Sequence, residues 1–334
     1  MTSKQEPLVS VVTPVFNGER YLRECIESVL AQTYSRWDYT VVNNCSTDRT
    51  LDIAREYSAR DSRIRIHDNE TFVRVIPNHN IAFRLISPQS KYCKVVQADD
   101  WLFPECIEKM VGLAEEHPTV AIVGSYGLWG KRVAWDGLPY PSTVLTGREV
   151  CRAKLLDGIY VFGAPTSLLF RSDIVRSRNS FYNESVLHAD KEVCLEFLQH
   201  HDFGFVHQVL TFTRVREESL TSMSDALQMT WPSILYDLVN YGPKYLSEDE
   251  LKCRVDEHLR HYYRFLGEQV YRRRGHEFWS FHRGKLAAVG YPLSMARLAA
   301  SVVSYMLDLV LNPKRFVEAI VRRLHRRKRE VASR

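Results

Sequence analysis

The chain has 334 residues, of which 45% are hydrophobic and 25% charged, which is typical of a globular protein and unlike a disordered or membrane-spanning one. Its net charge of +5 is unevenly distributed, because residues 312–334 hold nine Lys or Arg and only two acidic residues. The first 311 residues are therefore close to neutral, at −2. This distribution excludes a basic surface over the whole chain, and nucleic acid is not an expected partner.

The cysteines and the first residues indicate the compartment. Seven cysteines are scattered through the chain, and no pair has the CxxC spacing of a zinc site. The opening residues, MTSKQEPLVSVV, do not show a charged leader followed by an apolar stretch. We therefore expect reduced thiols and a cytoplasmic location.

Short β-branched runs alternate with helical patterns in the first hundred residues. The strand candidates are LVSVVT (8–13), YTVVN (39–43), IRIH (64–67) and KVVQA (94–98). Apolar residues recur at helical spacing between them, and a further helix is expected to begin at Pro104 with Glu105 in its first turn. Because the strand candidates are apolar throughout, they predict an α/β fold with a largely parallel sheet covered on both faces. In such sheets, ligands bind at the carboxyl ends of the strands.

The second half divides into two parts. Residues 146–216 have a mixed pattern, with helices predicted over 147–156 and 189–199 and strands over 167–171 and 203–216. From about residue 226 the pattern is helical, with long amphipathic stretches. We therefore predict an α/β domain over residues 1–225 and a helical region over residues 226–334.

Two adjacent carboxylates, Asp99 and Asp100, follow the fourth strand candidate. Neighbouring negative charges repel each other, and burying an unpaired charge raises its pKa or costs several kcal/mol. A hard cation such as Mg²⁺ or Mn²⁺, which prefers oxygen ligands, would explain the pair. A solvated turn that starts the next helix would also explain it.

Polar residues follow the first two strand candidates as well. Asn43 and Asn44 offer amide donors and acceptors to the edge of a nucleotide base, although helix capping by residues 46–48 also explains this segment. In TPVFNG, Pro14 and Phe16 either form a turn or line a base or ribose. Neither GxGxxG nor GxxxxGK[ST] occurs near these strand ends, which disfavours a dinucleotide-binding fold and a P-loop enzyme.

The segment LHADKEVCLEF, residues 187–197, places Asp190 in the first turn of a predicted helix. A carboxylate there complements the helix dipole, which contributes about 0.3–1 kcal/mol. If it faces a cleft, it could instead act as a general base. This segment alone leaves both interpretations open.

The order of these segments resembles a known family. The chain gives VSVVTPVFNGERYLRECIESVLAQTY, VVNNCSTDRT, QADDWLFPE, HADKE and TFTRVREESLT in succession. This set resembles family 2 glycosyltransferases with the GT-A fold, over residues 8–221, about two thirds of the chain. The resemblance implies a mostly parallel central sheet flanked by helices in a catalytic domain over residues 1–225. It also implies an inverting enzyme that transfers a sugar from a nucleotide-sugar donor, most often a UDP-sugar, to an acceptor hydroxyl.

The resemblance assigns the nucleotide to the ends of the first two strands. By this resemblance Thr13, Pro14 and Phe16 would line the base site. Asn43 and Asn44 would read the edge of the base. The family usually has two aspartates at these last two positions, which weakens the assignment of uracil as the base.

The resemblance also assigns the remaining site residues. Asp99 would contact ribose or metal, and Asp100 would be the leading ligand of Mn²⁺ or Mg²⁺. Asp190 would take the proton from the acceptor hydroxyl. Asn80, within PNHNIAF, stands about where the family usually has an Asn in the donor site, and Gln97 stands where its acidic motif often begins.

Near the end of the resemblance, many members of the family have an RxH pattern, whereas this chain has Arg214 and Arg216. These arginines either hold the donor diphosphate as bidentate partners or form a solvated strand end.

Two further classes of protein stay open. A nucleotidyltransferase would have a glycine-rich basic loop after the first strand, which TPVFNGERY matches poorly. A non-catalytic sugar-nucleotide-binding protein would explain Asn43, Asn44 and Gln97.

The basic segment FVEAIVRRLHRRKRE, residues 316–330, has apolar residues on one predicted helix face and arginines around them. It is either a surface helix with a solvated charged face or a helix lying on an anionic membrane, where each basic residue contributes about 1 kcal/mol. Many family members act on lipid-linked acceptors at the cytoplasmic membrane. The resemblance therefore implies a sugar or lipid-linked acceptor, a peripheral location at the inner membrane face, and a role in cell-surface polysaccharide or glycolipid synthesis.

Overall fold

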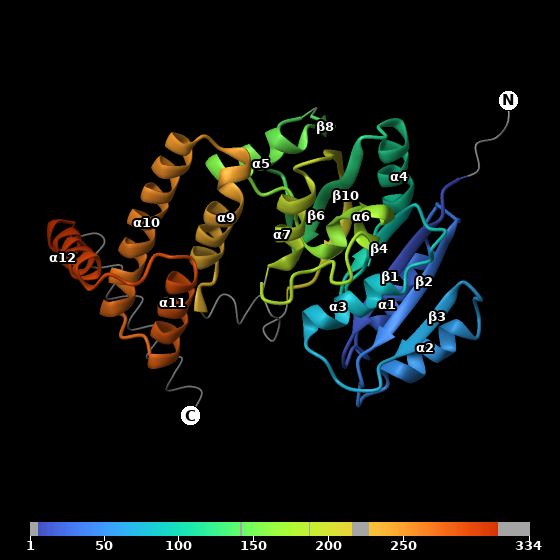
Figure 1. The fold of residues 1–334 in the computed structure, drawn as a ribbon. Coiled ribbons are helices and arrows are strands. Elements are labelled where there is room, and N and C mark those ends of the chain that lie inside the picture. The colour runs from blue at the N-terminus through green and yellow to red at the C-terminus, as the bar shows by residue number, and fades with distance from the viewer. Residues whose placement is uncertain (1–5, 141, 187, 216–226, 313–334) are drawn as a thin grey trace. The chain divides into compact units, whose positions relative to one another are not determined.

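The structure is a computed structural model that describes residues 6–140, 142–186, 188–215 and 227–312. The chain divides into two compact units, Met1–Ser219 and Leu220–Arg334. Unit 1 contains a large sheet with helices, and the described part of unit 2 is helical (Figure 1). The two units are described separately.

A single sheet organises unit 1, in the strand order β3-β2-β1-β4-β9-β6-β10-β5, with β7 paired to β6 and β8 to β10. The strands are β1 (Val9–Val15), β2 (Trp37–Asn43), β3 (Ile64–Asp68), β4 (Tyr92–Val95), β5 (Trp101–Leu102), β6 (Val120–Trp129), β7 (Arg132–Ala134), β8 (Val144–Leu145), β9 (Leu169–Arg171) and β10 (Asp202–Thr213). Strands β1 to β4 pair in parallel, as do β6 and β10, and β9 is antiparallel between β4 and β6. The predicted mostly parallel central sheet is confirmed.

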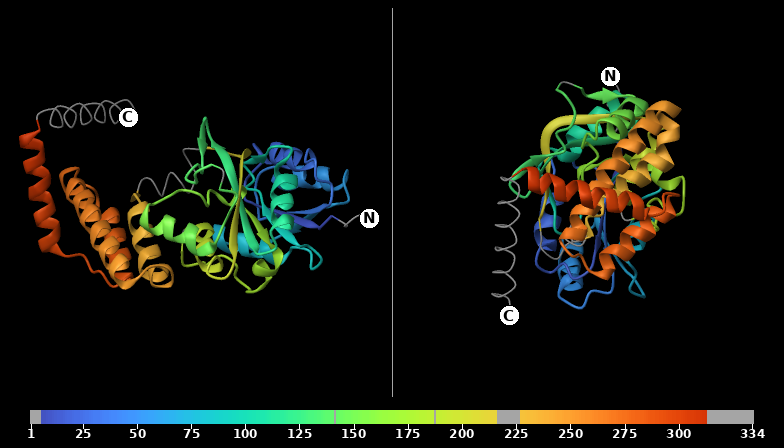
Figure 2. Two further views of the ribbon diagram at one scale, coloured as in Figure 1. Left: turned by 90° about the horizontal axis from the view of Figure 1, so that it is seen from above. Right: turned by 90° about the vertical axis from the view of Figure 1, so that its left-hand side faces the viewer.

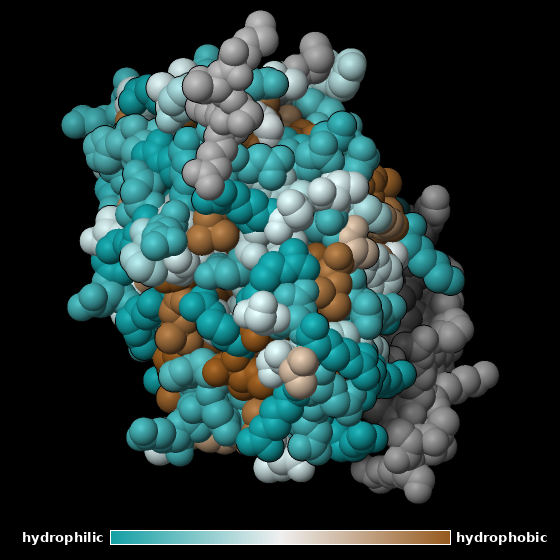
Figure 3. Space-filling view, turned by 90° about the vertical axis from the view of Figure 1, so that its right-hand side faces the viewer, coloured by the Kyte–Doolittle hydropathy of each residue, from teal (hydrophilic) through white to brown (hydrophobic). Residues whose placement is uncertain are grey.

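Helices cover both faces of the sheet. Those of unit 1 are α1 (Leu22–Leu30), α2 (Thr50–Ser58), α3 (Val75–Arg84), α4 (Cys106–Glu116), α5 (Gly147–Leu156), the 3₁₀ turn η1 (Pro165–Ser167), α6 (Ser172–Arg176) and α7 (Ala189–Phe197). Every residue of β1 is buried, which requires cover on both sides because successive strand side chains point to opposite faces. The outer surface of unit 1 drawn in Figure 3 is largely hydrophilic, with separate apolar patches.

One local expectation was wrong, and one long strand was not predicted. Helix α4 begins at Cys106 and not at Pro104, because the carbonyl of Pro104 accepts hydrogen bonds from the backbone and side chain of Thr33, which follows α1. Strand β6 was not predicted, since Gly124 and Gly127 interrupt its apolar run. These glycines allow close packing on β10: a Cβ at Gly127 would lie 2.7 Å from Oγ1 of Thr211.

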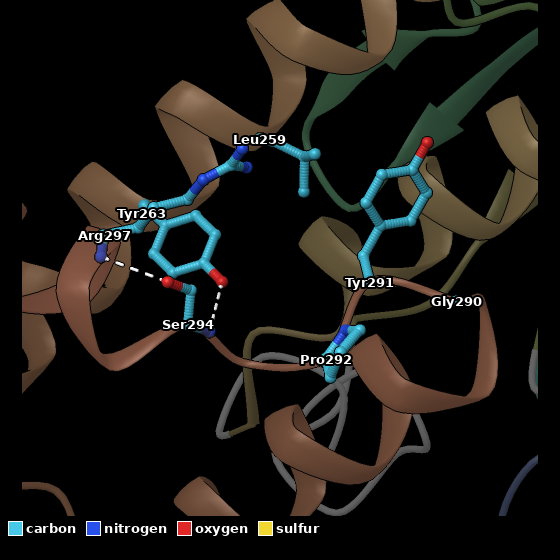
Figure 4. A pocket seen from close by; sticks show the side chains of 7 residues that line it. All are labelled: Leu259, Tyr263, Gly290, Tyr291, Pro292, Ser294 and Arg297. Carbon is cyan, nitrogen blue, oxygen red and sulfur yellow. Dashed lines mark hydrogen bonds between the residues drawn. The ribbon is translucent and has the colours of Figure 1, made fainter.

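The described part of unit 2 is a set of antiparallel and crossed helices. They are α9 (Thr230–Tyr245), α10 (Glu248–Tyr271), α11 (His276–Ala288) and α12 (Met295–Leu311). Helix α10 begins with a capping box formed by Ser247 and Glu250. A pocket of about 320 Å³ lies beside the N-terminal end of α12, where the Oη of Tyr263 accepts the backbone N–H of Ser294 at 2.8 Å (Figure 4).

Among the described helices, none combines the length and the apolar composition needed to cross a bilayer. The predicted basic helix over residues 316–330 lies outside the described residues.

The packing of α5 on the end of α7 gives a first test of the fold. A Cβ at Gly147 would lie 1.9 Å from the carbonyl oxygen of Leu198 and 2.2 Å from that of His201. Because backbone atoms cannot move aside cheaply, we expect Gly147→Ala to lower the free energy of unfolding by about 1–3 kcal/mol or more. Chemical denaturation of the full chain measures this change.

The matched control is Gly112→Ala in α4, where a Cβ would meet no atom within 4 Å. Alanine there should stabilise the chain by roughly 0.5–1 kcal/mol, because it lowers the entropy of the unfolded state without a clash. Equal effects of the two substitutions would contradict the described packing of α5.

Candidate active site

The site lies at the carboxyl ends of the parallel strands. Asp99 and Asp100 follow β4, Asn43 ends β2, and Arg214 follows β10. Because these strands are neighbours or near neighbours in one sheet, their ends bring together residues that are far apart in the sequence. This is the edge at which α/β proteins commonly bind ligands.

Asp100 is the most enclosed charged group at this edge, with a side chain only 3% exposed. Its Oδ2 accepts the hydroxyl of Thr166 at 2.6 Å and that of Thr213 at 3.4 Å, and its Oδ1 accepts the backbone N–H of Arg214 at 3.0 Å. These donors come from η1 and from the end of β10. The carboxylate therefore ties three segments of the chain together.

The partners of Asp100 do not neutralise its charge. No Lys, Arg or His of the described chain lies within ion-pair distance of its carboxylate. Burial, together with the neighbouring charge of Asp99, raises the pKa of Asp100 to about 7. A site with this property favours a cation nearby, because a positive charge would restore the ionised form of the pair.

A buried lysine supports the segment that holds Asp100. Lys94, in β4, is fully buried and donates from Nζ to the carbonyl oxygens of Thr166 at 2.7 Å and Leu168 at 3.2 Å. Burial lowers the pKa of the Lys94 ammonium. The lysine thus fixes η1 through its backbone carbonyls, and the Thr166 hydroxyl of η1 donates to Asp100.

The geometry of Asp99 and Asp100 differs from the roles expected for them as metal ligands. Asp100 was expected to be the leading metal ligand, but its carboxylate is buried and both oxygens are occupied by hydrogen bonds from the protein. Asp99 is half-buried, and its backbone carbonyl accepts a hydrogen bond from Arg214 Nε. Asp99 is thus the more accessible carboxylate.

The donor set fits a hard divalent cation with few protein ligands. The described residues contain no cluster of three or more acidic, His or Cys side chains. A cation at this edge would have Asp99 as ligand with Asp100 behind it, and would complete its coordination with water or phosphate. Such a partly hydrated arrangement suits Mg²⁺ or Mn²⁺ bound with a phosphate ligand.

Arg214 is neither a solvated strand end nor an open anion-binding group. Its Nε donates to the carbonyl oxygen of Asp99 at 3.1 Å, and its guanidinium forms an ion pair with Glu24. The same guanidinium lies 4.2 Å from the ring centroid of Tyr21. Arg214 therefore fixes the acidic segment against α1, a role that the sequence did not indicate. Arg216 lies outside the described residues.

The two asparagines after β2 are buried and differ in their partners. Asn44 donates to the carbonyl of Val73, and its Oδ1 accepts from Val73 N–H and Asn69 Nδ2. All these bonds hold the segment after β3, so the predicted contact with a base is not available to this side chain. Asn43 donates to Oδ1 of Asp68 at 2.7 Å, which places an amide and a carboxylate side by side at the ends of β2 and β3.

Two exposed aromatic rings stand near these strand ends. Phe16 and Phe72 are 48% and 59% exposed, and their ring centroids lie 4.9 Å apart in an edge-to-face arrangement. Phe72 was not among the predicted residues. Pro14 and Thr13 are buried within β1, and the Thr13 hydroxyl binds the carbonyl of Val96 at 2.8 Å. Of the predicted base-site residues Thr13, Pro14 and Phe16, only Phe16, which follows β1, is open to a ligand.

Asp190 lies in the first turn of α7 and is half-buried. Burial lowers the pKa of His79 and raises that of Tyr182, and the charge of Asp190 raises the pKa of both to a lesser extent. The Nδ1 of His79 lies 2.8 Å from the carbonyl of Val75 and must donate to it, so Nε2 accepts from Gln97 at 2.8 Å. Asp190 therefore lies near residues that adjoin the acidic segment.

Asn80 does not face a ligand. It is fully buried, and its amide binds both backbone groups of Tyr182 and the carboxylate of Glu184. It braces the segment that leads into α7 and so supports the position of Asp190.

These features agree with a family assignment. The model of the family described as "Glycosyl transferase family 2" matches residues 10–178, half of the chain. The chain belongs to this family. EpsE of Bacillus subtilis (strain 168), assigned as a glycosyltransferase, is 33% identical over 158 residues, which are 45% of this chain and 56% of EpsE. The chain spans about half the length of the curated relatives that it matches.

Solved structures of glycosyltransferases share the fold. TarS 1–349 of S. aureus in complex with UDP-GlcNAc has a TM-score of 0.57 and 18% identity, covering 77% of this chain and 73% of TarS 1–349. The mannosyltransferase PcManGT of Pyrobaculum calidifontis, in complex with GDP-Man and Mn²⁺, has a TM-score of 0.56 and 13% identity, covering 92% and 81%. The expected GT-A fold is thus confirmed for this family 2 glycosyltransferase.

Several residues of the site were not identified from the sequence. They include Glu24, Asp68, Phe72, Lys94 and Thr166. Lys94 gave a signal, because a lone charge within the apolar run KVVQA either ends the strand or is buried with carbonyl partners. The others occur in segments without a distinctive pattern, and only the folded chain brings them to the strand ends.

The buried charge predicts a stabilising substitution at the site. The folded chain binds a proton at Asp100 more readily than the unfolded chain does, so this group reduces stability as the pH rises from about 4 to about 7. In EDTA at pH 8, Asp100→Asn should raise the midpoint of thermal unfolding by a few degrees. At pH 4 the difference from the wild type should disappear, because both side chains are then neutral.

Thr166→Val is the companion variant, since it keeps the shape and removes the shortest hydrogen bond to the carboxylate. It should lower the midpoint at pH 8, where the charge loses its partner. A lower midpoint for Asp100→Asn at pH 8 would contradict the buried, unneutralised charge.

Proposed function

We propose that this protein is an inverting, metal-dependent glycosyltransferase that uses a nucleotide-sugar, most often a UDP-sugar in this family. The observation that carries the proposal is the acidic pair at the strand ends, with a buried carboxylate that no described cation neutralises. Such a site suits a divalent cation with a diphosphate, and the family supplies the reaction type. The donors present in the TarS and PcManGT structures support a nucleotide-sugar.

The nucleotide would occupy the edge formed by β1, β2 and β3. Phe16 and Phe72 provide exposed rings on which a base can stack, and stacking is worth about 1–3 kcal/mol per base. Asn44 binds the backbone of Val73, and the buried Asn43 binds Asp68 and the backbone N–H of Ser46, so the base edge would be read by the exposed carboxylate of Asp68. A carboxylate offers acceptors to the N–H donor of a pyrimidine edge.

The diphosphate would lie beside Asp99. When bound there, Mn²⁺ or Mg²⁺ stabilises the charge that develops on the departing diphosphate. The protein's part is to hold Asp99 in place, which Arg214 does through the backbone carbonyl. Asp100 adds negative potential behind the cation while its hydrogen bonds fix the turn.

Asp190 would act as the general base. It would take the proton from the acceptor hydroxyl as that oxygen attacks the anomeric carbon from the face opposite the diphosphate, which inverts the configuration. Its negative charge lies in the first turn of α7, where it complements the helix dipole. Asn80 and His79 would position it, because they support the segments on either side.

The acceptor would be a sugar or a lipid-linked glycan of a cell-surface polysaccharide or glycolipid. The basic composition of residues 312–334 supports a peripheral location at the inner face of the cytoplasmic membrane. Lipid-linked acceptors are exposed at such a surface.

The role of Asp190 can be tested without knowing the acceptor, because water can replace it. We expect the purified chain to release UDP from a UDP-sugar in the presence of Mn²⁺, with an inverted sugar product detected by NMR. Asp190→Asn should lower the rate at least about 100-fold and leave UDP affinity within about twofold of the wild type.

The matched control is Asp249→Asn, which removes an exposed aspartate from the first turn of α10. If Asp190 only complements its helix dipole, the two variants should behave alike. Wild-type binding of the nucleotide-sugar without turnover would instead favour a non-catalytic binding protein, the interpretation that Gln97 and Asn43 left open.

A further inference from the structure

The outer face of α12 is apolar and uncovered in the described chain. Met295, Val303, Met306, Leu307, Val310 and Leu311 are 67%, 59%, 44%, 55%, 75% and 80% exposed. The only charged residues of α12 are Arg297 and Asp308. A run of large apolar side chains on a single helix face exceeds the scattered exposure that is normal for a soluble surface.

An ordinary surface helix buries its apolar side chains, whereas α12 exposes most of its large ones. Asp308 is turned toward α10, where it forms an ion pair with Arg264 at 3.6 Å. Leu298 and Leu309 are the buried anchors on the same side, and Gly267 of α10 lets the helices approach so closely that a Cβ there would lie 2.9 Å from the backbone of Ser301. The inner face of α12 thus has a polar contact with α10, the helix beside which it is drawn in Figure 2.

The residues that follow this helix indicate what covers the outer face. Residues 312–334 begin directly after α12 and contain nine Lys or Arg and two acidic residues. An apolar helix face followed by a cationic segment has the two features that bind a peripheral protein to an anionic bilayer. A second copy of the chain is a poorer occupant, because it would bring two segments of charge +7 together.

We propose that the outer face of α12 docks on an anionic membrane, with its apolar side chains in the interfacial layer of the lipid. Helix α12 would lie parallel to the surface. This inference deepens the membrane contact proposed for residues 312–334 and assigns the apolar part of that contact to a described helix. The basic segment would supply attraction to the lipid headgroups, and α12 would supply the binding that persists at high salt.

The test uses the full chain and sedimentation with vesicles of phosphatidylcholine, with and without phosphatidylglycerol. The α12 variant combines Val303→Gln, Leu307→Gln and Val310→Gln. We expect it to bind phosphatidylglycerol vesicles at least about tenfold more weakly than the wild type, because three side chains lose apolar burial. Wild-type binding should also fall only partly in high salt, whereas the residual binding of the variant should be abolished.

The control variant combines Val75→Gln and Val133→Gln, which replace valines of unit 1 that are 44% and 53% exposed. It should bind vesicles as the wild type does. A second comparison neutralises four arginines of the basic segment, Arg322, Arg323, Arg326 and Arg327, to Gln. This variant lowers the charge of residues 312–334 from +7 to +3, so it should lose much of the preference for phosphatidylglycerol and keep its weak, salt-resistant binding.

Unchanged vesicle binding by the α12 variant would overturn the inference, and the basic segment would then account for any membrane contact alone. A change in oligomeric state by light scattering, without a change in vesicle binding, would identify the face as a self-association surface and also overturn it. UDP release from a UDP-sugar is measured on the same preparations without vesicles. Failure of the lipid proposal is therefore distinguishable from failure of the glycosyltransferase proposal.

Discussion

The buried charge of Asp100 is the constraint around which the strand ends of unit 1 are organised. A carboxylate that is 3% exposed must receive hydrogen bonds, and it receives them from η1 and from the end of β10. These donors connect segments more than sixty residues apart in the sequence. The ordered strand ends therefore depend on Asp100, and the protein alone does not favour the ionised form of this carboxylate. This is expected where a bound cation completes the site.

A second buried charge supports the same segment without neutralising the first. Lys94 binds the carbonyls of η1, and the hydroxyl of Thr166 in η1 binds Asp100. The lysine thus positions the donor and leaves the carboxylate charge to be balanced from the ligand side. Arg214 likewise leaves the charge of Asp100 unbalanced, because its guanidinium contacts Glu24 and Tyr21 and only its backbone N–H donates to Asp100.

The sequence predicted the sheet and the acidic pair because each depends on local patterns. Short β-branched apolar runs located β1 to β4, and two adjacent carboxylates located the site. The partners of each side chain were not predictable, because hydrogen bonds across the fold depend on register. Asn44 shows this limit: its amide matches a base edge in chemistry, yet in the fold it binds the backbone of Val73. Likewise, Asp100 is buried and Asp99 is accessible, which adjacent identical residues could not reveal.

The measurement that tests the central claim most directly is calorimetric titration of UDP into the wild-type chain, with Mn²⁺ and then with EDTA. If the acidic pair holds a cation that binds the diphosphate, UDP should bind with Mn²⁺ and at least about tenfold more weakly in EDTA. Equal affinity under both conditions, or no binding of UDP under either, would contradict a metal-dependent nucleotide site at Asp99 and Asp100.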